Sequence, residues 1–172
     1  MKKQGSTFST LKKENRLPAE LVQWDIFAPK PITVCFVCTG NTCRSPMAAA
    51  ALNHLGKGKY KAFSAGLSVC AGDKIAENAV KALKKAGIPS TLENPYALHD
   101  AVEIDDYFIR LSDLVFGLTT SHTIQLLSKF PDDSRKILSL PYDISDPFMY
   151  GEDVYDSCLK DIIECIKIQF DL

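Results

Sequence analysis

The sequence predicts a single α/β domain with a parallel sheet, for three reasons. Short apolar runs typical of buried strands alternate along the chain with amphipathic stretches typical of helices. The length of 172 residues is that of one ordinary domain. A content of 46% hydrophobic and 24% charged residues is that of a folded globular chain and excludes a disordered or low-complexity one.

The first strand is predicted at residues 32–37, because ITVCFV is apolar almost throughout, as in a strand buried on both faces. A loop follows, and then a helix with Ser45 as the predicted N-cap and Pro46 as the first helical residue. Apolar runs bounded by turn residues indicate further strands, and apolar residues at intervals of three and four indicate helices. In chain order these patterns predict a strand at 59–64, a helix at 73–86 closed by Gly87, a helix at 104–111, a strand at 114–118, a helix at 121–130, a short strand at 136–140 and a helix at 153–170.

Residues 1–30 differ from the rest and are predicted to form an N-terminal extension to a catalytic domain at 31–172. They are polar and lysine-rich as far as Asn15, then carry a short apolar patch that includes Trp24, and end among prolines. We expect one helical turn there. Docking of Trp24 on the domain and disorder of the extension both remain open.

Composition and charge indicate the compartment and the partners. The basic N-terminus is not followed by the apolar region of a signal peptide, and no stretch approaches the ~18–20 apolar residues of a membrane span. We therefore expect a cytoplasmic protein whose six cysteines are reduced thiols. The net charge of −1 gives no support for nucleic acid or a membrane as partner. A monomer without metal or cofactor is expected.

The loop CTGNTCRS at residues 38–45 has the features of a phosphate cradle. A tight turn from a strand into a helix directs successive backbone N–H groups inward, and the helix N-terminus adds a partial positive charge. Gly40 and Asn41 tolerate the left-handed backbone that such a turn needs. The guanidinium of Arg44 can bind two phosphate oxygens. Together these groups favour a thiolate at Cys38, placed for in-line attack on a bound phosphoryl group.

The segment CTGNTCRSPMAAA resembles the signature C-x-G-N-x-C-R-S-P of the low-molecular-weight protein tyrosine phosphatases. SAG at 64–66 and DPF at 146–148 support this resemblance, which runs from about Ile32 to the C-terminus. The resemblance implies a four-stranded parallel sheet between helices, in a flavodoxin-like three-layer arrangement. It also implies a phosphoric hydrolase that acts on phosphorylated proteins through a thiophosphoryl-enzyme intermediate.

The resemblance assigns the catalytic roles to residues that match the family. Cys38 would be the nucleophile, Arg44 would stabilise the transition state, and Asp146 would act as general acid and then as general base. The hydroxyl of Ser45 would donate to the Cys38 thiolate. The residues expected to contact phosphate or substrate are Thr39, Gly40, Asn41, Thr42, Cys43, Ser45 and Phe148.

Further residues are expected to support the loop rather than to react. The resemblance implies a buried network of Asn41, Ser64 and His99, and an exposed loop position for His99 remains the alternative. The other histidines, His54 and His122, are interpreted as surface or packing residues.

The remaining cysteines suggest rival functions. Cys35 and Cys38 lie three apart in a strand and therefore face opposite sides, so Cys35 is predicted to pack in the core, as are Cys158 and Cys165. Arsenate reductases share this fold and a similar loop, but they need two further cysteines close in sequence, and Cys70 stands alone. A non-catalytic phosphate-binding module would normally lack the cysteine, the arginine or the acid. Both alternatives are disfavoured but remain open.

Cys43 lies within reach of Cys38 along the loop, which suggests the hypothesis of a reversible disulfide that protects the nucleophile. The hypothesis predicts that hydrogen peroxide inactivates the enzyme and that dithiothreitol restores its turnover. Permanent loss of activity after peroxide would contradict it.

Thr42 bears on the substrate. Family members that act on phosphotyrosine often carry a branched apolar residue there, whereas a threonine hydroxyl can accept a hydrogen bond from a guanidinium. Thr42, followed later by SDPF at 145–148, resembles the subgroup that hydrolyses phosphoarginine on proteins, in which Asp146 would also pair with the substrate. The loop at 67–72 has no aromatic residue. The sequence slightly favours phosphoarginine, with phosphotyrosine as the alternative.

Overall fold

Four strands form one sheet in the order β2-β1-β3-β4, and every neighbouring pair is parallel. The strands are β1 (Ile32–Cys38), β2 (Tyr60–Gly66), β3 (Leu114–Gly117) and β4 (Ile137–Ser139). This computed structural model describes residues 30–70 and 72–172, so the predicted extension, including Trp24, lies outside the described residues apart from Lys30. The predicted four-stranded parallel sheet is confirmed.

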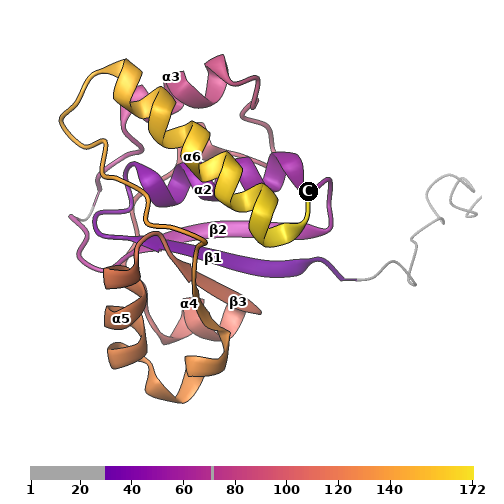
Figure 1. Ribbon diagram of the computed structural model, residues 1–172, viewed down its shortest axis with the longest axis vertical. Coiled ribbons are helices and arrows are strands. Elements are labelled where there is room, and N and C mark those ends of the chain that lie inside the picture. The colour runs from indigo at the N-terminus through magenta and orange to yellow at the C-terminus, as the bar shows by residue number, and fades with distance from the viewer. Residues whose placement is uncertain (1–29, 71) are drawn as a thin grey trace, which may run out of the picture. The chain divides into compact units, whose positions relative to one another are not determined.

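Helices cover both faces of the sheet, as the alternating pattern predicts (Figure 1). One face carries α2 (Arg44–Leu55), α3 (Glu77–Lys85) and α6 (Glu152–Phe170). The other carries α4 (Asp106–Leu111) and α5 (Thr120–Lys129). Two short 3₁₀ helices, η1 (Tyr96–Leu98) and η2 (Pro131–Lys136), complete the described elements. None of the helices in the described ranges is long and apolar enough to cross a membrane.

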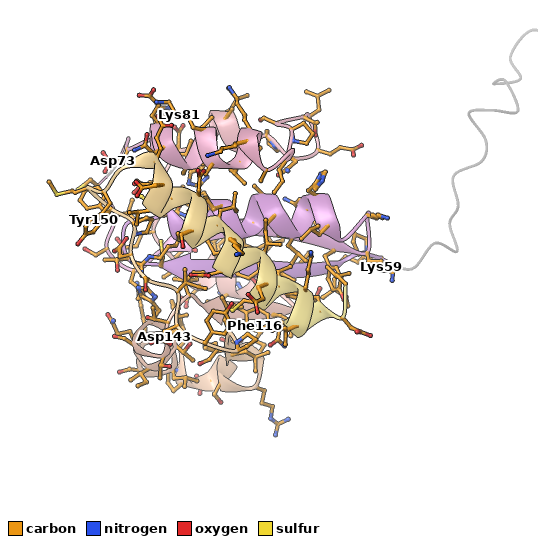
Figure 2. The ribbon with its side chains drawn as sticks, turned by 45° about the horizontal axis from the view of Figure 1, so that its top comes forward. Lys59, Asp73, Lys81, Phe116, Asp143 and Tyr150 are labelled. Atoms are coloured by element: carbon orange, nitrogen blue, oxygen red, sulfur yellow. The ribbon has the colours of Figure 1, made fainter. Side chains whose placement is uncertain are left out.

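The two apolar cores follow from the alternation of side chains along β1. Val34 and Phe36 face the core under α2 and α6, whereas Cys35 and Val37 face the core under α4 and α5. Figure 2 shows Phe116 of β3 inside the molecule, where its ring lies 5.9 Å from that of Phe36. Burial on both faces explains why β1 reads as a continuous apolar run.

The three cysteines predicted to pack in the core are buried there. Cys35, Cys158 and Cys165 are buried in the cores, and Cys70 is exposed. Burial raises the pKa of the Cys158 thiol to about 12, and it raises the pKa of Cys165 and Cys35 as well. All six cysteines are free thiols.

Two predicted helix starts are wrong. Helix α2 begins at Arg44 with Cys43 at the N-cap position, so Ser45 lies in the first turn and its hydroxyl caps nothing. Helix α3 begins at Glu77, because residues 73–76 form tertiary contacts instead of a helical turn. The backbone N–H of Ala76 donates to the carbonyl of Thr42 (2.8 Å), which ties this segment to the phosphate loop.

Strand β2 lies at an edge of the sheet, but the outer backbone groups of Ala62 and Gly66 are occupied. The side chain of Asn53, from α2, both donates to the carbonyl of Ala62 (2.9 Å) and accepts from its N–H (2.7 Å). Further along, Gly66 accepts from Ile104 (2.8 Å) and donates to Val102 (2.9 Å).

Candidate active site

The phosphate loop connects the carboxyl end of β1 to the N-terminus of α2. Cys38 is the last residue of β1, and Asn41 adopts the left-handed conformation with φ of 57°, as the tight turn requires. Within the described part of the chain, the backbone N–H groups of residues 39–45 donate to no protein acceptor. The loop therefore offers a set of free donors next to the positive end of a helix, which suits a bound anion.

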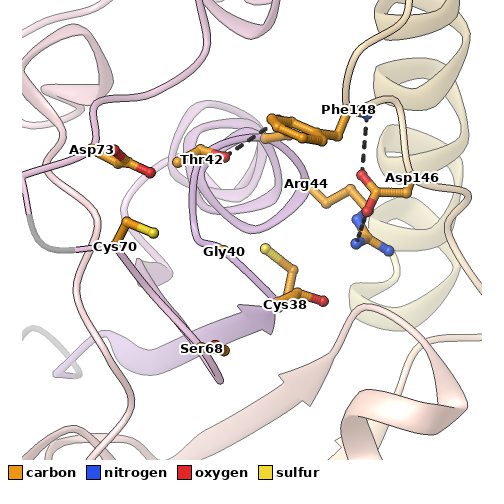
Figure 3. A pocket seen from close by; sticks show the side chains of 11 residues that line it. Cys38, Gly40, Thr42, Arg44, Ser68, Cys70, Asp73, Asp146 and Phe148 are labelled. Carbon is orange, nitrogen blue, oxygen red and sulfur yellow. Dashed lines mark hydrogen bonds and ion pairs between the residues drawn. The ribbon is translucent and has the colours of Figure 1, made fainter.

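A pocket of about 250 Å³ opens over this loop (Figure 3). The structure brings residues from three separate segments of the sequence into its wall. The described lining residues are Cys38, Thr39, Gly40, Thr42, Cys43, Arg44, Ser68, Cys70, Asp73, Asp146 and Phe148. Of the predicted site residues, Asn41, Ser45, Ser64 and His99 lie behind the wall.

Arg44 lies at the bottom of the pocket with only 7% of its side chain exposed. Its Nη2 donates to Oδ2 of Asp146 (2.6 Å), and its Nη1 donates to the carbonyl of Ile144 (3.3 Å). Its Nε is buried and has no partner among the described residues. A buried donor without a partner is costly, and a phosphate oxygen in the pocket would satisfy it.

Asp146 lies at the pocket rim, where 51% of its side chain is exposed. Besides the ion pair with Arg44, its Oδ1 accepts from the backbone N–H of Phe148 (3.2 Å). The carboxylate is thus both oriented and open to solvent. It can exchange a proton with a leaving group or with water.

Cys38 and Ser45 are in direct contact. The hydroxyl of Ser45 lies 3.0 Å from Cys38 Sγ, and it accepts from Nδ2 of Asn41 (2.9 Å). The same hydroxyl lies 3.3 Å from the carbonyl of Ala65, so its single proton has two acceptors within reach, that carbonyl and the sulfur. Directed at the sulfur, the proton stabilises a thiolate.

Asn41 joins the loop to the rest of the sheet. Its Nδ2 also donates to the hydroxyl of Ser64 (2.9 Å), its Oδ1 accepts from the N–H of Val102 (2.9 Å), and its carbonyl lies 2.8 Å from Nε2 of His99. Burial lowers the pKa of His99, so its ring is neutral at pH 7 and Nε2 carries the proton that it donates. Hydrogen bonds thus hold the left-handed turn from several sides.

His122, expected from the sequence to be a surface or packing residue, lies beside the phosphate loop. From helix α5 its Nε2 lies 3.0 Å from the hydroxyl of Thr39, and its Nδ1 lies 2.9 Å from the hydroxyl of Thr119. Burial and the nearby charge of Arg44 lower the pKa of His122. The available signal was its place just after β3, since parallel strands end at the same edge of a sheet.

Sequence analysis missed Tyr155 of α6. Its hydroxyl lies 3.2 Å from Sγ of Cys43, and burial raises the pKa of both groups. Cys43 is therefore a protonated thiol, and although it lines the pocket its sulfur is directed to Tyr155.

A strand–loop–helix phosphate cradle with a cysteine at its base, a buried arginine and a rim carboxylate defines a cysteine-dependent phosphatase. The chain belongs to the low molecular weight phosphotyrosine protein phosphatase family, whose model matches residues 33–170. No group of three or more potential ligands in the described ranges is arranged to hold a metal ion.

Individual relatives support this assignment. A protein-arginine-phosphatase of Geobacillus stearothermophilus is 33% identical over 132 residues, which are 73% of this chain and 84% of the relative. The solved low molecular weight protein tyrosine phosphatase of T. tengcongensis is 32% identical and superimposes with a TM-score of 0.74, over 82% of this chain and 99% of the other. A cysteine-to-serine mutant of YwlE arginine phosphatase, solved with a phosphorylated active-site serine, is 26% identical with a TM-score of 0.72, over 81% and 94% of the two chains.

Proposed function

We propose that the protein hydrolyses phosphoarginine on protein substrates through a thiophosphoryl intermediate on Cys38. The observation that carries this choice is the composition of the pocket wall. Thr42 and Asp146 supply oxygens that can accept from a guanidinium, and Phe148 is the single aromatic side chain among the described lining residues. The similarity to a protein-arginine-phosphatase supports the same choice.

In the first step the Cys38 sulfur attacks phosphorus and the phosphorus–nitrogen bond breaks. Arg44 and the free loop N–H groups hold the phosphoryl oxygens, and Asp146 gives its proton to the leaving guanidine nitrogen. For this, the guanidinium of Arg44 turns from Asp146 to the phosphoryl group, so substrate binding itself frees the acid. The phosphorylated serine in the mutant relative supports attack from this position of the loop.

In the second step Asp146, now a carboxylate, takes a proton from a water molecule that attacks the thiophosphoryl group. The sulfur–phosphorus bond breaks, inorganic phosphate leaves, and Cys38 returns as a thiolate stabilised by Ser45. The water supplies the oxygen of the product, and no redox change occurs.

We also propose that the enzyme acts in the cytoplasm and as a monomer. Six free thiols, one of them the nucleophile, need a reducing compartment, which supports the cytoplasm. Cys38, Arg44 and Asp146 lie together within one chain, so the proposed mechanism needs no second copy, and the proposed state is a monomer.

Phosphotyrosine is the second candidate substrate, because a solved relative of similar identity is a protein tyrosine phosphatase. Phe148 offers one apolar wall for a phenyl ring, with 60% of its side chain exposed. The side chain of Thr42, on the opposite wall, is the feature that distinguishes phosphoarginine from phosphotyrosine as the substrate.

Replacing Thr42 by isoleucine tests the substrate. We expect the ratio of kcat/KM for a phosphoarginine peptide to that for a phosphotyrosine peptide to fall about tenfold, because a methyl-rich wall replaces a hydroxyl acceptor. The ratio is measured by phosphate release with the two peptides in the same sequence context.

Thr42→Val is the matched control, because it removes the hydroxyl at nearly constant volume. It should shift the ratio in the same direction. An unchanged ratio for Thr42→Ile would show that this residue does not set specificity, whereas lack of turnover of phosphoarginine by the wild type would reject the proposed substrate.

A further inference from the structure

Asp73 is a carboxylate in the wall of the pocket that the mechanism does not use. Figure 3 shows it on the side of the pocket away from Asp146, beside Cys70 and Thr42. Asp146 is engaged with Arg44, whereas the side chain of Asp73 forms no hydrogen bond or ion pair with the described residues. The pocket thus carries one acidic group with no partner of its own.

The backbone holds Asp73 at this position. Its N–H donates to the carbonyl of Cys70 (3.2 Å) and its carbonyl accepts from the N–H of Ala101 (2.8 Å). Three residues later, Ala76 is bonded to the carbonyl of Thr42 in the phosphate loop (2.8 Å). The carboxylate is therefore attached to a fixed backbone, next to the loop that binds phosphate.

The neighbouring cation does not neutralise it. The ammonium of Lys74 forms an ion pair with Asp100, which does not line the pocket. Arg44 is the single cationic side chain in the described lining, and Asp146 already pairs with it. A free carboxylate beside a phosphate site repels every phosphoryl dianion, so its presence is unfavourable unless the substrate itself brings a positive charge.

We propose that Asp73 is a specificity-determining residue, which binds the guanidinium of the phosphorylated arginine side chain from the side opposite Asp146. This inference rests on the proposed function. A guanidinium presents several N–H donors in one plane, so Asp73 can accept from it on one side while Asp146 faces the leaving nitrogen on the other and the phosphoryl group lies over Cys38. A phenyl ring offers Asp73 no donor and no charge, so the same residue disfavours phosphotyrosine.

Asp73→Asn tests the proposal, because it removes the charge at constant shape. We expect kcat/KM for free N-phosphoarginine to fall about fivefold, as for a partly exposed ion pair, and the fall to diminish as salt is raised. Turnover of p-nitrophenyl phosphate, which carries no cation, should stay constant or rise up to about twofold as the repulsion is removed. Asp73→Glu, which keeps the charge, should retain most of the preference.

Glu93→Gln is the control for net charge, because Glu93 is exposed and lies outside the pocket wall. Glu93→Gln should leave the turnover of both phosphoarginine and p-nitrophenyl phosphate unchanged. If wild type hydrolyses phosphoarginine and Asp73→Asn leaves the preference between the two substrates unchanged, Asp73 has no such role and the proposed function stands. Asp73→Asn could instead lower kcat/KM for a basic phosphopeptide but not for free phosphoarginine. That result would show that Asp73 binds a residue of the peptide next to the phosphoarginine, and it would overturn the inference. A wild type that hydrolyses p-nitrophenyl phosphate but not phosphoarginine would overturn the proposed function and this inference with it.

Discussion

Cys38→Ser should lower kcat by at least about 10⁴-fold while leaving phosphate binding nearly intact, since the nucleophile is lost but the cradle is not. The donors that the proposal places around phosphate are the loop N–H groups and Arg44, and none of them depends on the sulfur. Steady-state phosphate release measures the first effect. Titration calorimetry with inorganic phosphate measures the second.

Cys43→Ser is the matched control, since it changes a second thiol of the same loop. The sulfur of Cys43 is hydrogen-bonded to the hydroxyl of Tyr155 in the core. We therefore expect Cys43→Ser to lower stability moderately and to retain turnover. Multiple turnovers by Cys38→Ser would exclude Cys38 as the nucleophile. A single phosphoryl group trapped on the introduced serine, detected by mass spectrometry, would agree with the mechanism because it is only the first half of the reaction.

Asp146→Asn should lower kcat by about 10²- to 10³-fold with substrates whose leaving group needs a proton, which is the usual contribution of a general acid. Phosphoarginine belongs to this class. The loss should be smaller for p-nitrophenyl phosphate, because p-nitrophenolate leaves without protonation. Comparing kcat for the two substrates in wild type and variant measures the difference.

Asp143→Asn provides the control for a carboxylate three residues away. Asp143 accepts from the N–H and hydroxyl of Thr120 at the start of α5, and it lies outside the pocket wall. Its loss should cost stability but leave kcat near the wild-type value. If Asp146→Asn turned over phosphoarginine at the wild-type rate, another group would have to supply the proton.

The features that could be predicted are those determined by residues close together in the sequence. β1 is recognisable because both its faces are buried, and Gly87 marks the end of α3 because its φ of 76° suits glycine. The phosphate loop is also one contiguous segment, so the spacing of its cysteine and arginine could be recognised directly in the sequence. The resemblance to a known family then supplied Asp146, which no spacing rule connects to Cys38.

The parts that were missed depend on contacts between distant segments. Ser45 fits an N-cap by residue type, yet its hydroxyl contacts Cys38, and α2 begins at Arg44, two residues before the predicted start. His122 and Tyr155 look like ordinary helix residues, and only the folded sheet brings them to the loop. Asp73 falls in a segment predicted as helix, and the contact of Ala76 with Thr42 makes it part of the pocket.

The contact of Asn53 with Ala62 has a consequence for the molecule at high concentration. An open strand edge is a template on which another chain can add a strand, which is how many β-rich proteins aggregate. Because the amide of Asn53 occupies both outward backbone groups of Ala62, and Val102 and Ile104 occupy those of Gly66, an incoming strand finds no continuous row of partners on β2. At the other edge, β4 is only three residues long. We therefore expect both edges of the sheet to be poor templates for a further strand.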